Sequence, residues 1–129
     1  MILAYLAAPL SPNGSETFVS NIARAKRYYR NLSTTMRDHV FVADWILHCE
    51  AFIPQVRLID GGTAALPEDP TLRVLGMARN FELIQRCDEI YLVGPRMSGG
   101  MSDELDYAKA RGLTFYEWIA GEMPAWMKE

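Results

Sequence analysis

The sequence predicts an α/β domain, a flavodoxin- or Rossmann-like three-layer sandwich around a parallel sheet of four to five strands. Short apolar runs at 2–8, 39–43, 89–93 and 113–118 alternate with segments of helical periodicity. Strands that alternate with helices imply right-handed crossovers and a sheet covered on both faces. Four such strands close naturally in the order 2-1-3-4. The 129 residues suit a single domain that spans residues 1–129.

The N-terminal half is predicted to hold two strands and two helical segments. Turn residues at 9–14 stop the first strand, and Ser15 is the expected N-cap of the first helix. The apolar side chains of this helix recur at spacings of three and four. They are Phe18, Ile22, Ala25, Tyr29 and Leu32. The second strand leads into one or two helical turns at 45–53, and residues 55–70 are expected to form a flexible connection.

The C-terminal half is predicted to hold two helices and two strands in alternation. In chain order they are a helix at 70–86, the strand at 89–93, a helix at 102–110 and the strand at 113–118. Pro70 suits the first turn of a helix, and Gly112 suits the position just past a helix end. The apolar tail after residue 118 is expected to dock against another surface.

Composition and charge exclude several classes of protein. A net charge of −3 gives no electrostatic footprint for binding a nucleic acid polymer or a membrane. The apolar run at 2–8 lacks a basic segment before it and is too short to span a bilayer, so a cytoplasmic protein is expected. Cys49 and Cys87 are expected to be reduced and structural. No metal site and no cofactor are predicted.

One edge of the predicted sheet is the expected ligand site. In such sheets ligands bind beyond the carboxyl ends of the strands, where the strand order reverses. This rule brings together the residues that follow the first three strands. They are the loop at 9–15, the pair Asp44 and Trp45, and the loop at 94–100. Ala8 and Pro9, where the first strand ends, are candidate binding residues. A pair of glycines before a helix, as in Ser98-Gly99-Gly100, suits a phosphate or another anion, although such a pair is more often just a turn.

Glu104 follows this glycine loop and is the candidate reactive group. It is placed about one turn into the short helix, where the helix dipole is expected to keep it ionised. An ionised carboxylate beside the anomeric carbon of a sugar can act as a nucleophile. A glutamate at such a position is more often an ordinary surface residue, and Asp103 and Asp106 are equally available by position. The sequence has no P-loop lysine pattern and no G-x-G-x-x-G after the first strand, which disfavours nucleotide hydrolysis and dinucleotide redox chemistry.

Four segments resemble one known family in matching order along nearly the whole chain. Residues 98–108 (SGGMSDELDYA) resemble the nucleophile segment of nucleoside 2-deoxyribosyltransferases. The resemblance extends to their deoxynucleotide N-hydrolase relatives and to uncharacterised small bacterial and phage domains grouped with them. Residues 5–10 (YLAAPL) resemble the first strand of this superfamily. Residues 21–25 (NIARA) are similar to an early helix, and 87–90 (CDEI) to the entry of the third strand.

The resemblance implies a role for several residues. Glu104 would attack C1′ of a deoxyribose, and Tyr5 would position it. The loop residues Ser98, Gly99, Gly100 and Met101 would hold ribose or phosphate. The ligand would be a nucleoside or nucleotide, and the family's habit of assembling implies a homodimer or a higher homo-oligomer.

Asn80 marks a departure from the family's pattern. The family carries an aspartate eight residues before the residue that matches Asp88, and this aspartate exchanges a proton with the base. An amide can hydrogen-bond a ligand but does not exchange a proton at neutral pH. Asn80 would then contact the base or a ribose hydroxyl, and general acid catalysis would be impaired or come from another group. Asp88 itself is expected to be structural.

Three hypotheses stay open on the sequence. The first is an N-glycosidic hydrolase or (deoxy)ribosyltransferase, and the second is a non-catalytic nucleotide-binding module of the same fold. The third is a structural or partner-binding domain that docks through the segment at 118–126. Trp45 either stacks a base or packs in the core. His39 and His48 are possible acid–base residues, although a lone histidine is more often structural.

Overall fold

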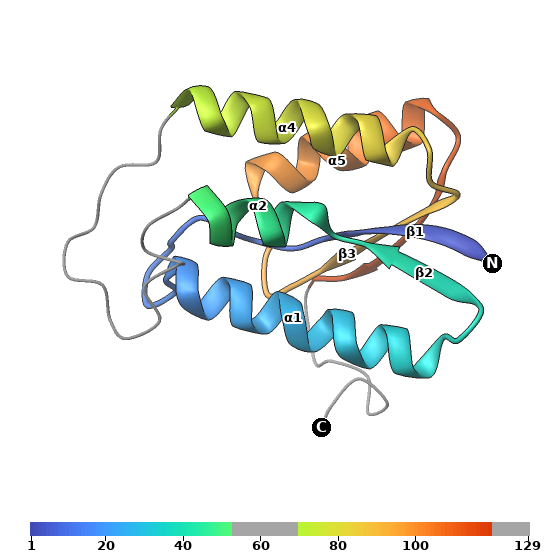
Figure 1. The fold of residues 1–129 in the computed structure, drawn as a ribbon, viewed down its shortest axis with the longest axis horizontal. Helices are drawn as coiled ribbons and strands as arrows, with labels where there is room; N and C mark the ends of the chain where they lie inside the picture. The colour runs from blue at the N-terminus through green and yellow to red at the C-terminus, as the bar shows by residue number, and fades with distance from the viewer. Residues whose placement is uncertain (53–69, 120–129) are drawn as a thin grey trace.

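The computed structural model describes residues 1–52 and 70–119 and contains, in these ranges, one four-stranded parallel sheet (Figure 1). The strands are β1 (Ile2–Ala7), β2 (His39–Val42), β3 (Glu89–Val93) and β4 (Thr114–Trp118). Their order is β2-β1-β3-β4, and every pair is parallel. The predicted fold class and strand order are therefore confirmed.

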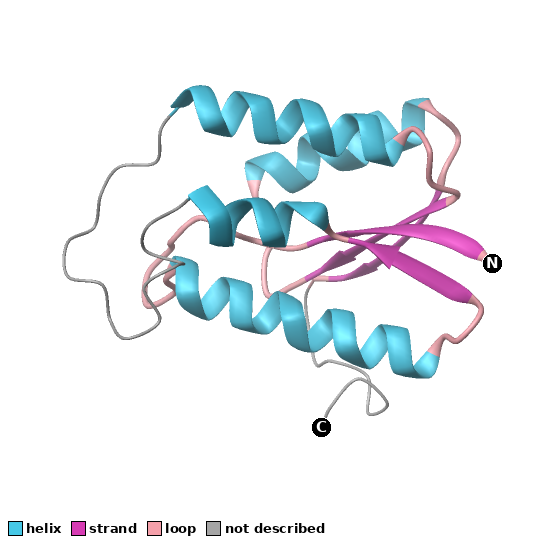
Figure 2. Ribbon diagram, in the orientation of Figure 1, coloured by secondary structure: helices cyan, strands magenta, loops and turns pink. Residues whose placement is uncertain are grey.

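Helices cover the sheet on both faces, which gives the predicted three layers (Figure 2). They are α1 (Phe18–Thr35), α2 (Asp44–Phe52), α4 (Pro70–Ile84) and α5 (Gly99–Ala110). Alternate residues of a strand point to opposite faces. Ala4 and Leu6 of β1 accordingly pack with Tyr28 and Leu32 of α1, whereas Tyr5 packs with residues of α2, α4 and α5. The central strands are buried on both faces.

The first helix begins later than predicted and buries a different tyrosine. Its N-cap is Thr17, because Ser15 lies in the turn that the bridge between Asn13 and Glu16 closes. Thr17 and Ser20 form a reciprocal capping box. Tyr28 is buried, whereas Tyr29, expected in the apolar stripe, is 43% exposed. Both positions satisfy helical spacing from Ala25, so packing decides between them.

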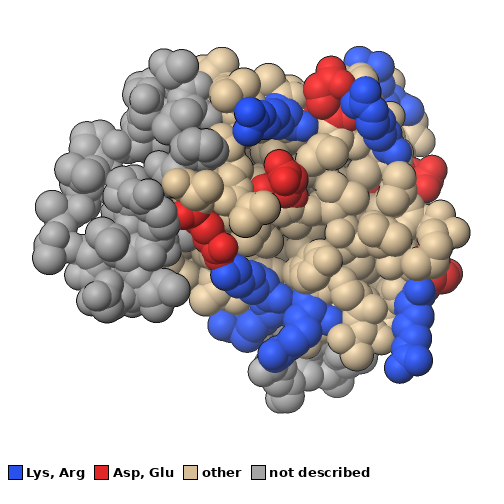
Figure 3. Space-filling view, viewed as in Figure 1, with Lys and Arg blue, Asp and Glu red and all other residues tan. Residues whose placement is uncertain are grey.

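Basic side chains of α1 lie on its solvent side. Lys26, Arg27 and Arg30 are exposed, and Figure 3 shows blue side chains gathered over this helix at the lower part of the view. Acidic and basic residues are interspersed over the rest of this face. Within the described residues, no helix combines the length and the apolar character that crossing a bilayer requires.

The helix α5 begins three residues earlier than predicted. Its N-cap is Ser98, whose hydroxyl accepts a hydrogen bond from the Met101 amide at 3.2 Å. The two glycines assigned to the loop therefore form the first turn of the helix, because a good N-cap offsets their low helix propensity. The end of the helix is as predicted, with Gly112 at a φ of +80° just past it.

Gly94 follows β3 at a point where the backbone of β4 comes very close. Its amide donates to the carbonyl of Trp118 at 2.9 Å, and an added Cβ would lie 2.5 Å from the carbonyl oxygen of Ile119. This contact fixes the start of the loop that leads to Ser98. The side chains of Cys49 and Cys87 are both buried thiols. The predicted connection at 55–69 and the C-terminal tail after residue 119 lie outside the described residues.

Candidate active site

A cavity of about 250 Å³ opens at the carboxyl edge of the sheet. Its walls come from the segment after β1, from α2 and α4, and from the loop that joins β3 to α5. This is the edge at which doubly wound sheets bind ligands, since the crossovers from β1 to β2 and from β3 to β4 run in opposite directions there. The predicted position of the site is thus where the cavity lies.

Most of the predicted site residues meet in this cavity. The lining includes Ala8, Trp45, Asn80, Ser98, Gly99, Gly100, Met101 and Glu104. Tyr5 lies directly behind Glu104 and is fully buried. Besides Tyr5, two predicted residues are not part of the lining: Pro9 is buried in the interior, and Asp44 is exposed in the first turn of α2.

A short hydrogen bond joins the two candidate catalytic residues. The Tyr5 hydroxyl donates to Oε2 of Glu104 at 2.5 Å, across 99 positions of sequence. Tyr5 is 0% exposed and Glu104 only 6% exposed. The bond therefore links the central strand to α5 through two buried polar groups, and it fixes one oxygen of the carboxylate.

Burial raises the pKa of the Glu104 carboxyl to about 7, although hydrogen bonds from Tyr5 and Asn80 lower it. The expectation that the helix dipole keeps this group ionised is therefore wrong. Glu104 is the sixth residue of α5, beyond the first turn in which the dipole acts strongly, so desolvation dominates. The same burial, with the nearby Glu104 charge, raises the pKa of Tyr5 well above its usual value. Tyr5 consequently keeps its proton and acts as a donor.

Asn80 lies on α4 and hydrogen-bonds the Glu104 carboxyl with its side chain. It is 9% exposed, and its Nδ2 atom lies 4.0 Å from the Met77 sulfur. The position at which the sequence lacks the expected aspartate thus directly adjoins the candidate nucleophile. An amide here supports the carboxylate by hydrogen bonding and has no proton to exchange at neutral pH.

Trp45 combines the two roles that the sequence left open. Its indole Nε1 donates to the carbonyl of Leu6 at 2.7 Å, and the side chain is only 7% exposed. It is part of the core, and it also contributes to the cavity wall. The bond to the β1 backbone fixes the indole, so the wall is rigid at this point.

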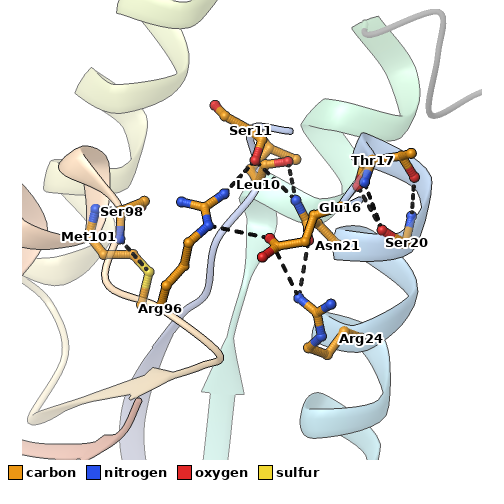
Figure 4. A network of polar contacts seen from close by, with 10 residues as sticks. All are labelled: Leu10, Ser11, Glu16, Thr17, Ser20, Asn21, Arg24, Arg96, Ser98 and Met101. Atoms are coloured by element: carbon orange, nitrogen blue, oxygen red, sulfur yellow. Dashed lines mark hydrogen bonds and ion pairs between the residues drawn. The ribbon is translucent and has the colours of Figure 1, made fainter. Parts of the chain in front are cut away.

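Arg96 lies at the mouth of the cavity and was not singled out by sequence reasoning. It donates from Nη2 to the Ser11 carbonyl at 2.5 Å and from Nε to Glu16 at 3.3 Å (Figure 4). Asn21 donates to the carbonyls of Leu10 and Ser11 at 2.8 and 3.1 Å. Two loops that follow different strands are thereby tied together around a cation. An arginine three residues after a buried strand that ends at the ligand edge was the available signal.

The first turn of α5 faces the same cavity. Gly99 and Gly100 line it, and amide groups in the first turn of a helix have no intrahelical acceptor. The hydroxyl of Ser98 serves as the helix cap. Together with the Arg96 guanidinium, this helix end makes the mouth of the cavity suitable for an anion.

The two histidines lie at opposite edges of the sheet. His39 hydrogen-bonds Asp38 at 2.7 Å and Glu89 at 2.8 Å at the amino ends of the strands, far from the cavity along β2 and β3. His48 lies on α2 and lines the cavity. Within the described ranges, no three His, Cys, Asp or Glu side chains are arranged to hold a metal ion.

The fold and the cavity define a doubly wound α/β domain with a buried glutamate at the carboxyl edge of its sheet. A family model described as "Domain of unknown function (DUF7768)" matches residues 63–117. The match includes Asn80, the Ser98 loop and Glu104, whereas Tyr5 lies before it. No curated protein and no solved structure gives a significant match.

Proposed function

We propose that the chain is an N-glycosidic bond hydrolase or (deoxy)ribosyltransferase that acts on a nucleoside, a nucleotide or a related ribosyl compound. Glu104 is the nucleophile, Tyr5 orients it, and Asn80 contacts the sugar or base. The observation that carries the proposal is the 2.5 Å hydrogen bond between Tyr5 and Glu104, which fixes a buried carboxylate in the cavity. The sequence resemblance to nucleoside 2-deoxyribosyltransferases points to the same pair.

The proposed reaction has two steps. A Glu104 carboxylate oxygen attacks C1′, and the electron pair of the C1′–N bond leaves with the base. If the chain is a hydrolase, water then attacks C1′ of the glycosyl ester and releases the sugar. If it is a transferase, a second base attacks C1′ and a new nucleoside is formed. The cavity of about 250 Å³ is near the lower end of the roughly 300–1,000 Å³ range of small-molecule sites, which suits one small ligand. Arg96 and the start of α5 suit a phosphate at the mouth.

A non-catalytic nucleotide-binding module is the second candidate function. Asn80 favours it, because the amide beside Glu104 cannot protonate a leaving base. The protonation of Glu104 favours it too, since a pKa of about 7 leaves only about half of the nucleophile ionised at neutral pH. A module of this kind binds nucleotide and releases no base.

We also propose that the chain assembles as a homodimer or a larger homo-oligomer in the cytoplasm. The edge strand β4 supports assembly, since Phe115 and Tyr116 on it are 43% and 39% exposed. Free, buried cysteines support a reducing compartment. Light scattering after gel filtration measures the assembly, and a monomeric mass contradicts it.

The test of the proposed function is a panel of nucleosides and nucleotides, read by melting shift and by release of free base. We expect one member to raise the melting temperature and to release its base. Glu104→Gln should keep the melting shift and lower base release by at least about 1,000-fold, as loss of a nucleophile does. Asp106→Asn, which removes an exposed carboxylate from the same helix, should leave release unchanged.

The outcomes separate the candidates. A melting shift without any released base supports the binding module. Unchanged release by Glu104→Gln removes Glu104 as the nucleophile. If no compound in the panel raises the melting temperature or loses its base, the structural or partner-binding domain is the remaining hypothesis.

A further inference from the structure

The proposed reaction lacks a proton donor for the departing base. The Arg96 guanidinium lines the cavity but does not give up a proton in proteins. Asn80 has an amide in place of an acid, and Glu104 is used as the nucleophile. Of the described residues that line the cavity, His48 carries the side chain that most often serves as a general acid in enzymes.

His48 and Asn80 lie on neighbouring walls of the cavity. His48 belongs to α2, and its ring lies against Gly76 of α4, where an added Cβ would be 3.2 Å from Nε2 and 3.4 Å from Cδ2. Gly76 and Asn80 are four residues apart, so they share one face of α4. The imidazole therefore packs on the helix face that carries the amide beside Glu104. The absence of a side chain at Gly76 is what lets the ring approach so closely.

We propose that His48 is the general acid of this site and takes the part that an acid at the Asn80 position would have. The inference rests on the proposed function. A Glu104 carboxylate oxygen bonds to C1′ while the C1′–N bond breaks, and the imidazolium N–H of His48 gives its proton to a ring nitrogen of the base. In the second step water bonds to C1′, its proton passes to the neutral imidazole, and the Glu104 carboxylate is released. Nucleoside and water thus give free base and sugar, with both side chains restored.

The effect of losing His48 should therefore depend on the leaving group of the substrate. A base needs a proton to depart, whereas a 4-nitrophenolate leaves without one. The substrates to compare are therefore the deoxynucleotide that the panel identifies and 4-nitrophenyl 2-deoxyriboside. Loss of a general acid affects the first and spares the second, whereas loss of the nucleophile affects both.

Three variants make the test. His48→Asn should lower kcat/KM for the deoxynucleotide by roughly 100-fold or more and leave the nitrophenyl substrate nearly unchanged. Gly76→Ala should lower kcat/KM for the deoxynucleotide by a smaller factor, because the added methyl group displaces the imidazole. Alanine also favours a helix by about 1 kcal/mol over glycine, so this variant keeps the test valid if His48→Asn folds poorly. Leu47→Ala, at the neighbouring position of α2 and 65% exposed, should change neither substrate.

Each outcome of this experiment either supports or overturns the role of His48. Equal losses on both substrates, or no loss on the deoxynucleotide, overturn the role of His48 while Glu104→Gln still abolishes both activities. If the wild-type protein acts on neither substrate, the proposed function fails and the role of His48 fails with it. Loss confined to the deoxynucleotide in both His48→Asn and Gly76→Ala supports the general acid.

Discussion

Each of the two edges of the sheet holds an ionisable group, half-buried His39 at the amino edge and buried Glu104 at the carboxyl edge. Their surroundings shift the two protonation equilibria in opposite senses. At the amino edge, His39 lies between the carboxylates of Asp38 and Glu89. Burial alone would lower the pKa of His39, but hydrogen bonds to both carboxylates raise it above its usual value. The fold therefore favours the charged form there.

At the carboxyl edge, Glu104 is buried beside Tyr5 and Asn80, which are both neutral donors. Within the described part of the chain it forms no ion pair with Lys, Arg or His. Burial raises the pKa of its carboxyl to about 7, so the fold favours the neutral form. A charge that is compensated at one edge stabilises the structure, whereas the uncompensated carboxyl at the other edge costs stability. Such a cost is typical of reactive sites.

The largest expected effect is on Glu104→Gln, whose free energy of unfolding should exceed that of the wild type. It tests the contrast between the two edges of the sheet. Between the ordinary pKa of 4.5 and about 7 the unfolded chain has lost this proton and the folded chain still holds it. Wild-type stability must therefore fall as the pH rises through this window. Above it the cost is on the order of 3 kcal/mol, which glutamine avoids while keeping the side-chain shape.

Urea unfolding at about pH 4 and about pH 8 measures this gain. The stability difference between Glu104→Gln and wild type should be small at the lower pH and should grow toward the higher one. Asp106→Asn, on the exposed side of α5, should show no such growth. A difference that stays constant with pH would mean that the folded and unfolded chains hold this proton equally well.

A smaller effect is expected from Tyr5→Phe, which keeps the ring and removes the donor. A hydrogen bond to a charged group contributes about 1.5–3 kcal/mol, so base release should fall by roughly 10- to 150-fold. The bond also lowers the pKa of Glu104, so its loss should move the acid limb of the pH–rate profile to higher pH.

Tyr91→Phe is the matched control at the amino edge. Tyr91 is also buried, and its hydroxyl donates to Glu89 at 3.3 Å. The variant should leave the rate and its pH profile unchanged. Equal effects of the two substitutions on the rate would show that a buried tyrosine hydroxyl matters for folding alone.

The sequence was sufficient to predict the layers, the strand order and the edge that carries the cavity. These follow from the alternation of apolar runs with helical periodicity and from the handedness of crossovers, which are local or general rules. The start of α5 was predicted wrongly because Gly99 and Gly100 resemble a loop until the cap at Ser98 is seen. Spacing alone could not choose between Tyr28 and Tyr29, since both fit the helix period.

The candidate site was only partly predictable for a related reason. Glu104 and the Ser98 loop follow from position along the chain, and they line the cavity. The protonation of Glu104 depends on how completely other elements bury it, which no local pattern reports. The places of Arg96 and His48 depend on contacts across the fold, with Ser11 and Gly76 respectively. Side chains that are placed by tertiary contacts, rather than by period, are the ones whose positions could not be predicted from the sequence.

The smallest effect, and the one that completes the comparison, is expected from His39→Asn at the amino edge. The raised pKa means that the folded chain holds the His39 proton more tightly than the unfolded chain does. Its contribution is therefore fully present below the ordinary pKa of 6.5 and is lost as the pH rises through the folded value. Removing the ring should cost roughly 1–2 kcal/mol at low pH, from hydrogen bonds to two carboxylates, and less at high pH.

The same urea series measures this loss, and base release serves as the control. The destabilisation by His39→Asn should shrink as the pH rises, so this variant approaches the wild-type stability. The stabilisation by Glu104→Gln should grow, so that variant departs from the wild-type stability. Base release should be unchanged, because His39 begins β2 and the cavity lies beyond the other ends of the strands. A loss of activity in His39→Asn without a loss of stability would show that the two edges are coupled through the sheet. The charge of His39 would then support the reaction in addition to stabilising the fold.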